Sequence, residues 1–82
     1  MKLPRDLSGR ELASLLRRYG YEVSRQTGSH IRLVSNERGH EHRITVPDHS
    51  PLRVGTLNSV LGDVAAYLER DKSSVTEELF GH

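Results

Sequence analysis

The spacing of apolar residues near the start of the chain predicts an amphipathic helix. The apolar positions that share one face at 3.6 residues per turn are Leu12, Leu15, Leu16 and Tyr19. The polar positions on the opposite face are Arg10, Ser14 and Arg17. Ser8 and Glu11 have the spacing of a capping box, and Gly20 stands where a left-handed residue would end the helix. We therefore expect a helix between Ser8 and Gly20 with a cationic outer face.

Alternating apolar and polar residues follow and predict three short strands. These strands cover residues 21–26, 30–35 and 41–46, with tight turns at Gly28 and at residues 36–39. Because side chains alternate between the two faces of a strand, the residues expected on the core face are Ile31, Leu33, Ile44 and Val46. The same alternation leaves on the open face His30, Arg32, Val34, Glu41, Arg43 and Thr45. Because short turns join the strands, we expect an antiparallel meander.

A second helical pattern begins after the proline-containing loop at residues 47–51. Its apolar positions at helical spacing are Leu57, Val60, Leu61, Val64 and Leu68. Thr56 is the expected N-cap, Gly62 interrupts the pattern, and the helix is expected to end near Glu69. Ser74 and Glu77 have capping-box spacing and predict a short third helix or a frayed tail.

The order α-β-β-β-α predicts an α+β fold in one domain, residues 1–82. Each long helix has one apolar stripe, and the sheet has one apolar face. Two helices packed on one face of a three-stranded antiparallel sheet bury all three apolar surfaces. A short C-terminal helix would add to this arrangement.

Composition narrows the class of protein. The chain has 82 residues and no cysteine, which excludes disulfides and thiolate metal sites and fits a reducing cytoplasm. It contains no apolar run typical of a signal peptide or a membrane span, so we expect a cytoplasmic protein without membrane contact.

Charge is distributed unevenly along the chain. Residues 1–46 carry nine basic and five acidic side chains, a net charge of +4, whereas residues 47–82 carry three basic and six acidic ones, a net charge of −3. Ten of the twelve basic residues are arginine, whose planar guanidinium matches phosphate oxygens in pairs. A polyanion is therefore expected to contact the first helix and the strands, although a solvated mixture of charges would give the same composition.

His30 is the main candidate for chemistry. It directly follows the Gly28-Ser29 turn and shares the open face of its strand with Arg32. An imidazole that titrates near neutrality, beside a permanent cation, suits cleavage of a phosphodiester, because one group moves a proton and the other holds negative charge. The alternative interpretation is a solvated surface histidine without a chemical role.

The other histidines favour structural roles. His40 and His42 share a strand face, but a metal site needs three or four converging ligands, and only Asp48 and His49 are obvious additional donors. We expect no metal site, with His40 and His42 at a polar turn edge and His49 as a hydrogen-bonding loop residue. Gly55 and Thr56, at the expected start of the second helix, offer backbone N–H groups to an anion.

Several segments together resemble the HicA toxins of bacterial and archaeal toxin-antitoxin pairs. The segments that carry the resemblance are Ser8-Gly9-Arg10-Glu11-Leu12, Gly20-Tyr21, Arg25-Gln26-Thr27-Gly28-Ser29-His30, Val46-Pro47-Asp48-His49, Gly55-Thr56-Leu57 and Val60-Leu61. The resemblance implies a fold like the double-stranded-RNA-binding domain, mRNA endonuclease activity without metal or other cofactor, and a HicB-type antitoxin as partner. It also implies that His30 is the catalytic residue. The chain departs from the family pattern after Leu61: family members commonly turn there into a short segment that bears Ala and Gly, whereas this chain continues through residues 62–68 into a charged extension.

We therefore expect a monomeric endoribonuclease toxin that acts on mRNA. His30 would take the proton from a ribose 2′-hydroxyl, and Arg32 or Arg43 would stabilise the charge on the phosphate oxygens, with His49 as a candidate general acid. The residues expected to bind RNA are Arg10, Arg17, Arg25, Ser29, Arg32, Arg43, Gly55 and Thr56. The alternatives are a module that binds RNA without cutting it, and an interaction module whose edge strand pairs with another protein.

Overall fold

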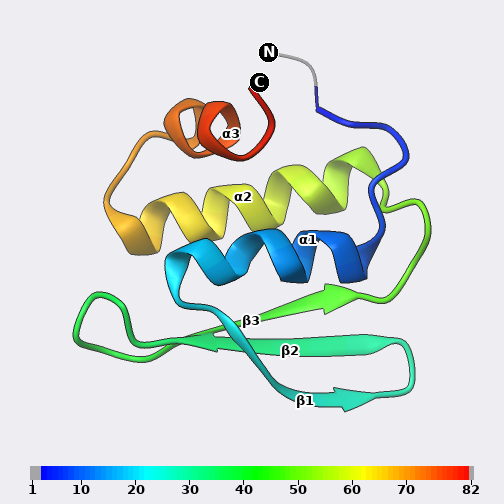
Figure 1. Cartoon of the computed structure of the whole chain (residues 1–82), viewed down its shortest axis with the longest axis horizontal. Helices are drawn as coiled ribbons and strands as arrows, with labels where there is room; N and C mark the ends of the chain where they lie inside the picture. Colours follow the sequence, from blue (N-terminus) through cyan, green and yellow to red (C-terminus); the bar gives the residue numbers. More distant parts are fainter. Residues whose placement is uncertain (1–2, 82) are drawn as a thin grey trace.

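The computed structural model describes residues 3–81 and consists of one sheet, three α-helices and a short 3₁₀ helix (Figure 1). The elements are α1 (Gly9–Leu16), η1 (Arg17–Tyr19), β1 (Glu22–Thr27), β2 (His30–Ser35), β3 (His42–Pro47), α2 (Val54–Leu68) and α3 (Lys72–Phe80). The expected α-β-β-β-α order and the C-terminal helix are both confirmed.

The three strands form an antiparallel sheet in the order β1-β2-β3, with α1 and α2 on one of its faces (Figure 1). α3 packs against α2 on the side away from the sheet. The hydrophobic core contains Leu12, Leu16, Tyr21, Ile31, Leu33, Val46, Leu57, Leu61, Val64 and Val75, which are all almost completely buried. No element among residues 3–81 covers the other face of the sheet, as expected from the alternation.

α1 begins and ends where its sequence signals indicate. The Ser8 hydroxyl accepts a hydrogen bond from the Glu11 N–H, and the Glu11 carboxylate accepts one from the Ser8 N–H, so the capping box is complete. Hydrogen bonding to Ser8 holds the pKa of Glu11 below its ordinary value. The last turn tightens into η1 and ends at Gly20, whose φ of 82° is left-handed.

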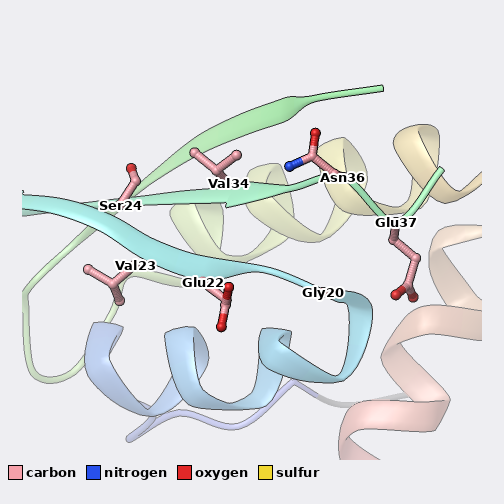
Figure 2. A pocket seen from close by; sticks show the side chains of 7 residues that line it. All are labelled: Gly20, Glu22, Val23, Ser24, Val34, Asn36 and Glu37. Carbon is pink, nitrogen blue, oxygen red and sulfur yellow. The ribbon is translucent and has the colours of Figure 1, made fainter. Parts of the chain in front are cut away.

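β1 departs from the expected alternation because it contains a β-bulge. Val23 pairs with Leu33 and Arg25 pairs with Arg32, so Ser24 is an extra residue in the ladder. Val23 points toward α1 and Ser24 points away from it (Figure 2). Strict period two would place Val23 and Arg25 on the same face, whereas the bulge places them on opposite faces.

Several boundaries differ from the sequence prediction. β1 and β3 each lie one residue further along the chain than expected. Thr56 is not the N-cap of α2, because Arg53 takes that position in an extended conformation and makes no side-chain cap bond. The predicted capping box at Ser74 and Glu77 is also wrong, since α3 begins at Lys72 and has Asp71 as its N-cap. Gly62 is tolerated inside α2, which ends at Leu68 with Glu69 as its C-cap, close to the expected end.

α3 is joined to the end of the first helical segment by polar contacts around Glu78. The Tyr19 hydroxyl and the Arg70 guanidinium both donate hydrogen bonds to the Glu78 carboxylate, and Arg18 donates to the Glu78 carbonyl at 2.8 Å. Burial, together with the Glu78 contact, raises the pKa of Tyr19 to about 12. These contacts hold α3 over the core beside α2.

Candidate functional site

His30 stands at the end of the sheet where the β1–β2 turn lies. Gly28 has a φ of 55°, which a two-residue type II′ turn requires at its first central position, and Ser29 completes the turn. His30 is the first residue of β2 and pairs with Thr27 on β1 and Pro47 on β3. Its imidazole is exposed on the open face, as the alternation predicted.

The loop after β3 is fastened to this turn and to α1. The Asp48 N–H donates to the Ser29 carbonyl at 2.7 Å, and the Gly9 N–H donates to the His49 carbonyl at 2.9 Å. The N-termini of α1 and α2 lie at this same end of the molecule (Figure 1). The positive ends of both helix dipoles therefore lie at the same end of the molecule as the β1–β2 turn.

The Asp48 carboxylate connects α1 to β1. Both of its oxygens lie 3.2 Å from Nε of Arg10, and Oδ2 also accepts a hydrogen bond from Nε2 of Gln26 at 3.2 Å. Arg10 keeps most of its side chain exposed. The sequence analysis gave Asp48 and Gln26 no structural role beyond their place in the segments that resemble the family, because no local pattern connects residues so far apart in the chain.

Three of the expected RNA-binding arginines lie on the open face of the sheet. Arg25 and Arg32 are directly opposite each other on β1 and β2. Arg43 pairs with Val34 further from the turn, and its Nε contacts Oε2 of Glu41 at 2.7 Å. The Glu41 contact raises the pKa of Arg43.

The remaining expected RNA-binding residues lie away from that face. Arg10 and Arg17 line a cavity of about 180 Å³ between α1 and β1. Gly55 and Thr56 lie in the first turn of α2, where backbone N–H groups have no helical partner. The structure therefore gathers Ser29, His30, Arg10 and the start of α2 at one end, but it leaves Arg17 at the far end of α1.

His40 lies exposed in the turn before β3, His42 is the first residue of β3, and both rings contact Tyr67. His42 stacks on Tyr67 with ring centroids 4.7 Å apart, and its Nδ1 shares a hydrogen bond with the Tyr21 hydroxyl at 2.7 Å. Burial raises the pKa of Tyr21, so the hydroxyl keeps its proton. Among residues 3–81, no group of three or more His, Cys, Asp or Glu side chains is placed to hold a metal ion.

β1 is an edge strand, and all of its residues are exposed. A shallow cavity of about 440 Å³ lies along it, and Figure 2 shows Val23, Val34 and Glu37 in its lining. Val23 has 57% of its surface exposed. The bulge at Ser24 interrupts the regular strand geometry, which disfavours pairing with another chain.

A comparison with protein families identifies the class of protein to which this fold and site belong. The family model described as HicA toxin of bacterial toxin-antitoxin matches residues 9–65, a range that runs from the first residue of α1 into the last turn of α2. The chain belongs to the HicA toxin family. No curated protein and no solved structure matches the chain. None of the helices between residues 3 and 81 has the length and apolar character needed to cross a bilayer.

Proposed function

We propose that this toxin is an endoribonuclease that cleaves mRNA without a metal ion and uses His30 as the general base. The observation that carries the proposal is the position of His30, which lies exposed at the start of β2 on the same uncovered face as Arg25 and Arg32. Family membership supports a toxin role, and an mRNA substrate agrees with the expected cytoplasmic location. We also propose a HicB-type antitoxin as partner of a monomeric toxin.

The proposed reaction begins at a ribose 2′-hydroxyl. His30 removes its proton while the 2′-oxygen bonds to the adjacent phosphorus, and the bond from phosphorus to the 5′-oxygen breaks. The products are a 2′,3′-cyclic phosphate and a 5′-hydroxyl, so the leaving oxygen must gain a proton. His49 remains the candidate donor, since its backbone is tied to the same end of the molecule as His30. DNA lacks the attacking hydroxyl and should not be cleaved.

Arg32 is better situated than Arg43 to stabilise charge on the phosphate. Arg32 lies two residues from His30 along the same strand face, about 7 Å at 3.4 Å per residue. Arg43 lies opposite Val34, one step further away, and already contacts the Glu41 carboxylate. An anion at His30 would therefore meet the free guanidinium of Arg32 first.

The decisive experiment is His30→Ala, with Thr27→Ala as its matched control. Thr27 is the direct cross-strand neighbour of His30, so the control perturbs the same end of the hairpin without removing the imidazole. Both variants should keep their stability within about 0.5 kcal/mol, as is usual for exposed positions. His30→Ala should lose RNA cleavage and growth arrest but retain RNA binding. A folded His30→Ala protein that cuts RNA as fast as wild type would contradict the assignment.

A second measurement tests the absence of a metal requirement. Wild-type protein should cleave RNA in excess EDTA, because proton transfer at His30 needs no metal-bound water. Loss of cleavage in EDTA and its recovery with a divalent ion would overturn this part of the proposal. RNA binding without cleavage by wild-type protein in any condition would favour the alternative of a non-catalytic RNA-binding module.

A further inference from the structure

Arg25 and Arg32 face each other across β1 and β2 on the open face of the sheet. Residues directly opposite in an antiparallel pair have Cβ atoms about 5 Å apart, so the two side chains rise from the sheet side by side. Both residues are exposed. Within residues 3–81, neither guanidinium takes part in any of the ion pairs that the structure contains.

This pairing is unfavourable for the protein alone. Like charges directly opposite each other destabilise a strand pair. The other arginines that form ion pairs with carboxylates are Arg10, Arg38, Arg43 and Arg70. An anion bound between Arg25 and Arg32 would remove their repulsion, and a phosphate offers two oxygens to two guanidinium groups.

The bulge at Ser24 is what brings Arg25 to this position. An unbulged ladder continuing from the Val23–Leu33 pair would place Ser24 opposite Arg32, and Arg25 opposite the buried Ile31. The extra residue instead aligns Arg25 with Arg32. Bulges often occur next to active sites, where they redirect a side chain.

We propose that Arg25 and Arg32 together clamp the scissile phosphate of the RNA, one guanidinium on each non-bridging oxygen. The proposal rests on the ribonuclease function proposed above and adds Arg25 as a second catalytic cation. Arg32 is about 7 Å from His30 along the strand, which the extended side chain of an arginine can span. Negative charge on the two oxygens grows as the 2′-oxygen bonds to phosphorus, so the clamp binds the transition state more tightly than the substrate.

The test combines binding and cleavage by Arg25→Gln, Arg32→Gln and the double variant. Arg38→Gln is the matched control, because it removes the same charge from the loop at the opposite end of the sheet. Affinity is measured on a short labelled RNA of mixed sequence with 2′-O-methyl groups, which cannot be cleaved. The cleavage rate is measured on the unmodified RNA in single-turnover reactions with saturating protein.

The clamp predicts a characteristic set of results. Each single variant should lower the saturated cleavage rate roughly 10²- to 10³-fold, the usual effect of losing one donor to a developing oxyanion. The double variant should lose less than the product of the two single effects, because both groups act on one phosphate. The slope of log affinity against log salt should fall by about 0.7 in the double variant, the value for one phosphate of a single strand. Arg38→Gln should keep the wild-type rate and slope.

Three outcomes would overturn the clamp. A fall of about 1.4 in the salt slope of the double variant would mean two separate phosphates. Reduced affinity with an unchanged saturated rate would place the arginines on a phosphate that is not cleaved. Unchanged binding and cleavage would assign the pair to another anion, such as an acidic protein segment. If the arginine variants bind and cleave RNA as wild type does while His30→Ala does not cleave it, the clamp is wrong but the proposed ribonuclease function stands. If wild-type protein does not cleave RNA, the ribonuclease function itself is contradicted.

Discussion

Replacing Gly9 with alanine should destabilise the protein, and the structure gives the reason. A Cβ at Gly9 would lie 1.9 Å from the Pro47 carbonyl oxygen and 3.0 Å from the Pro47 carbonyl carbon, with the Asp48 Cα at 3.3 Å. All three are backbone atoms, so no flexible side chain can move aside. The loop after β3 would have to shift away from α1, which breaks the Gly9–His49 hydrogen bond.

The expected loss of stability is about 3 kcal/mol, at the upper end of the usual cost of overpacking. For a domain of this size, about 1 kcal/mol changes Tm by roughly 4–8 °C, so Tm should fall by roughly 12–24 °C. Gly62→Ala is the matched control, since Gly62 lies inside α2 and a Cβ added there would have no atom within 4 Å. Its helix propensity should improve stability by about 0.5–1 kcal/mol. Thermal and urea unfolding measure the stability of both variants. A Gly9→Ala protein as stable as wild type would refute the close approach of α1 to the loop after β3.

Two further predictions concern contacts that stabilise the fold. Hydrogen bonds from Tyr19 and Arg70 hold the pKa of Glu78 below its ordinary value of 4.5. Between the lowered pKa and pH 4.5, unfolding therefore takes up a proton at Glu78. The stabilisation from these contacts is present above pH 4.5 and is lost as the pH falls through the lowered pKa. Urea unfolding over a pH series should therefore show a shallower loss of stability below pH 4.5 for Glu78→Gln than for wild type, and equal slopes would contradict the Glu78 contacts. Tyr67→Phe removes a hydroxyl that accepts from the Arg38 N–H at 2.9 Å and donates to the His40 carbonyl at 2.7 Å, and it should lower the free energy of unfolding by about 1–3 kcal/mol. Unchanged unfolding by urea would show that these bonds contribute nothing.

The features that the sequence predicted correctly depend on neighbouring residues. The capping box at Ser8 and Glu11 and the left-handed Gly20 act within one helical turn, so their spacing alone locates the ends of the first helical segment. β2 has the expected bounds because it is the central strand, and its inward side chains Ile31 and Leu33 must be apolar.

The features that it missed depend on contacts between distant segments. Nothing in the residues around Ser24 marks a bulge, because β1 is an edge strand with exposed side chains on both faces and no burial pattern to reveal its register. The sequence placed His42 at the polar edge of its strand but did not predict the contacts of its ring with Tyr21 and Tyr67, which are distant in the chain. α2 begins at Val54, two residues before the expected N-cap Thr56, directly after a loop in which the Leu52 N–H donates to the Leu7 carbonyl.

The candidate site contains exposed residues on the open face of the sheet and residues held by contacts between distant segments. Variants of these two groups should behave differently. His30, Arg25 and Arg32 are exposed on the open face of the sheet, so substitutions there should affect the proposed chemistry with little effect on folding. Gly9 and the Asp48 loop are held by backbone contacts to α1 and the β1–β2 turn, so substitutions there disturb stability and the position of His30 together. Loss of cleavage identifies a chemical role only on the open face of the sheet, and at the loop it must be separated from unfolding first.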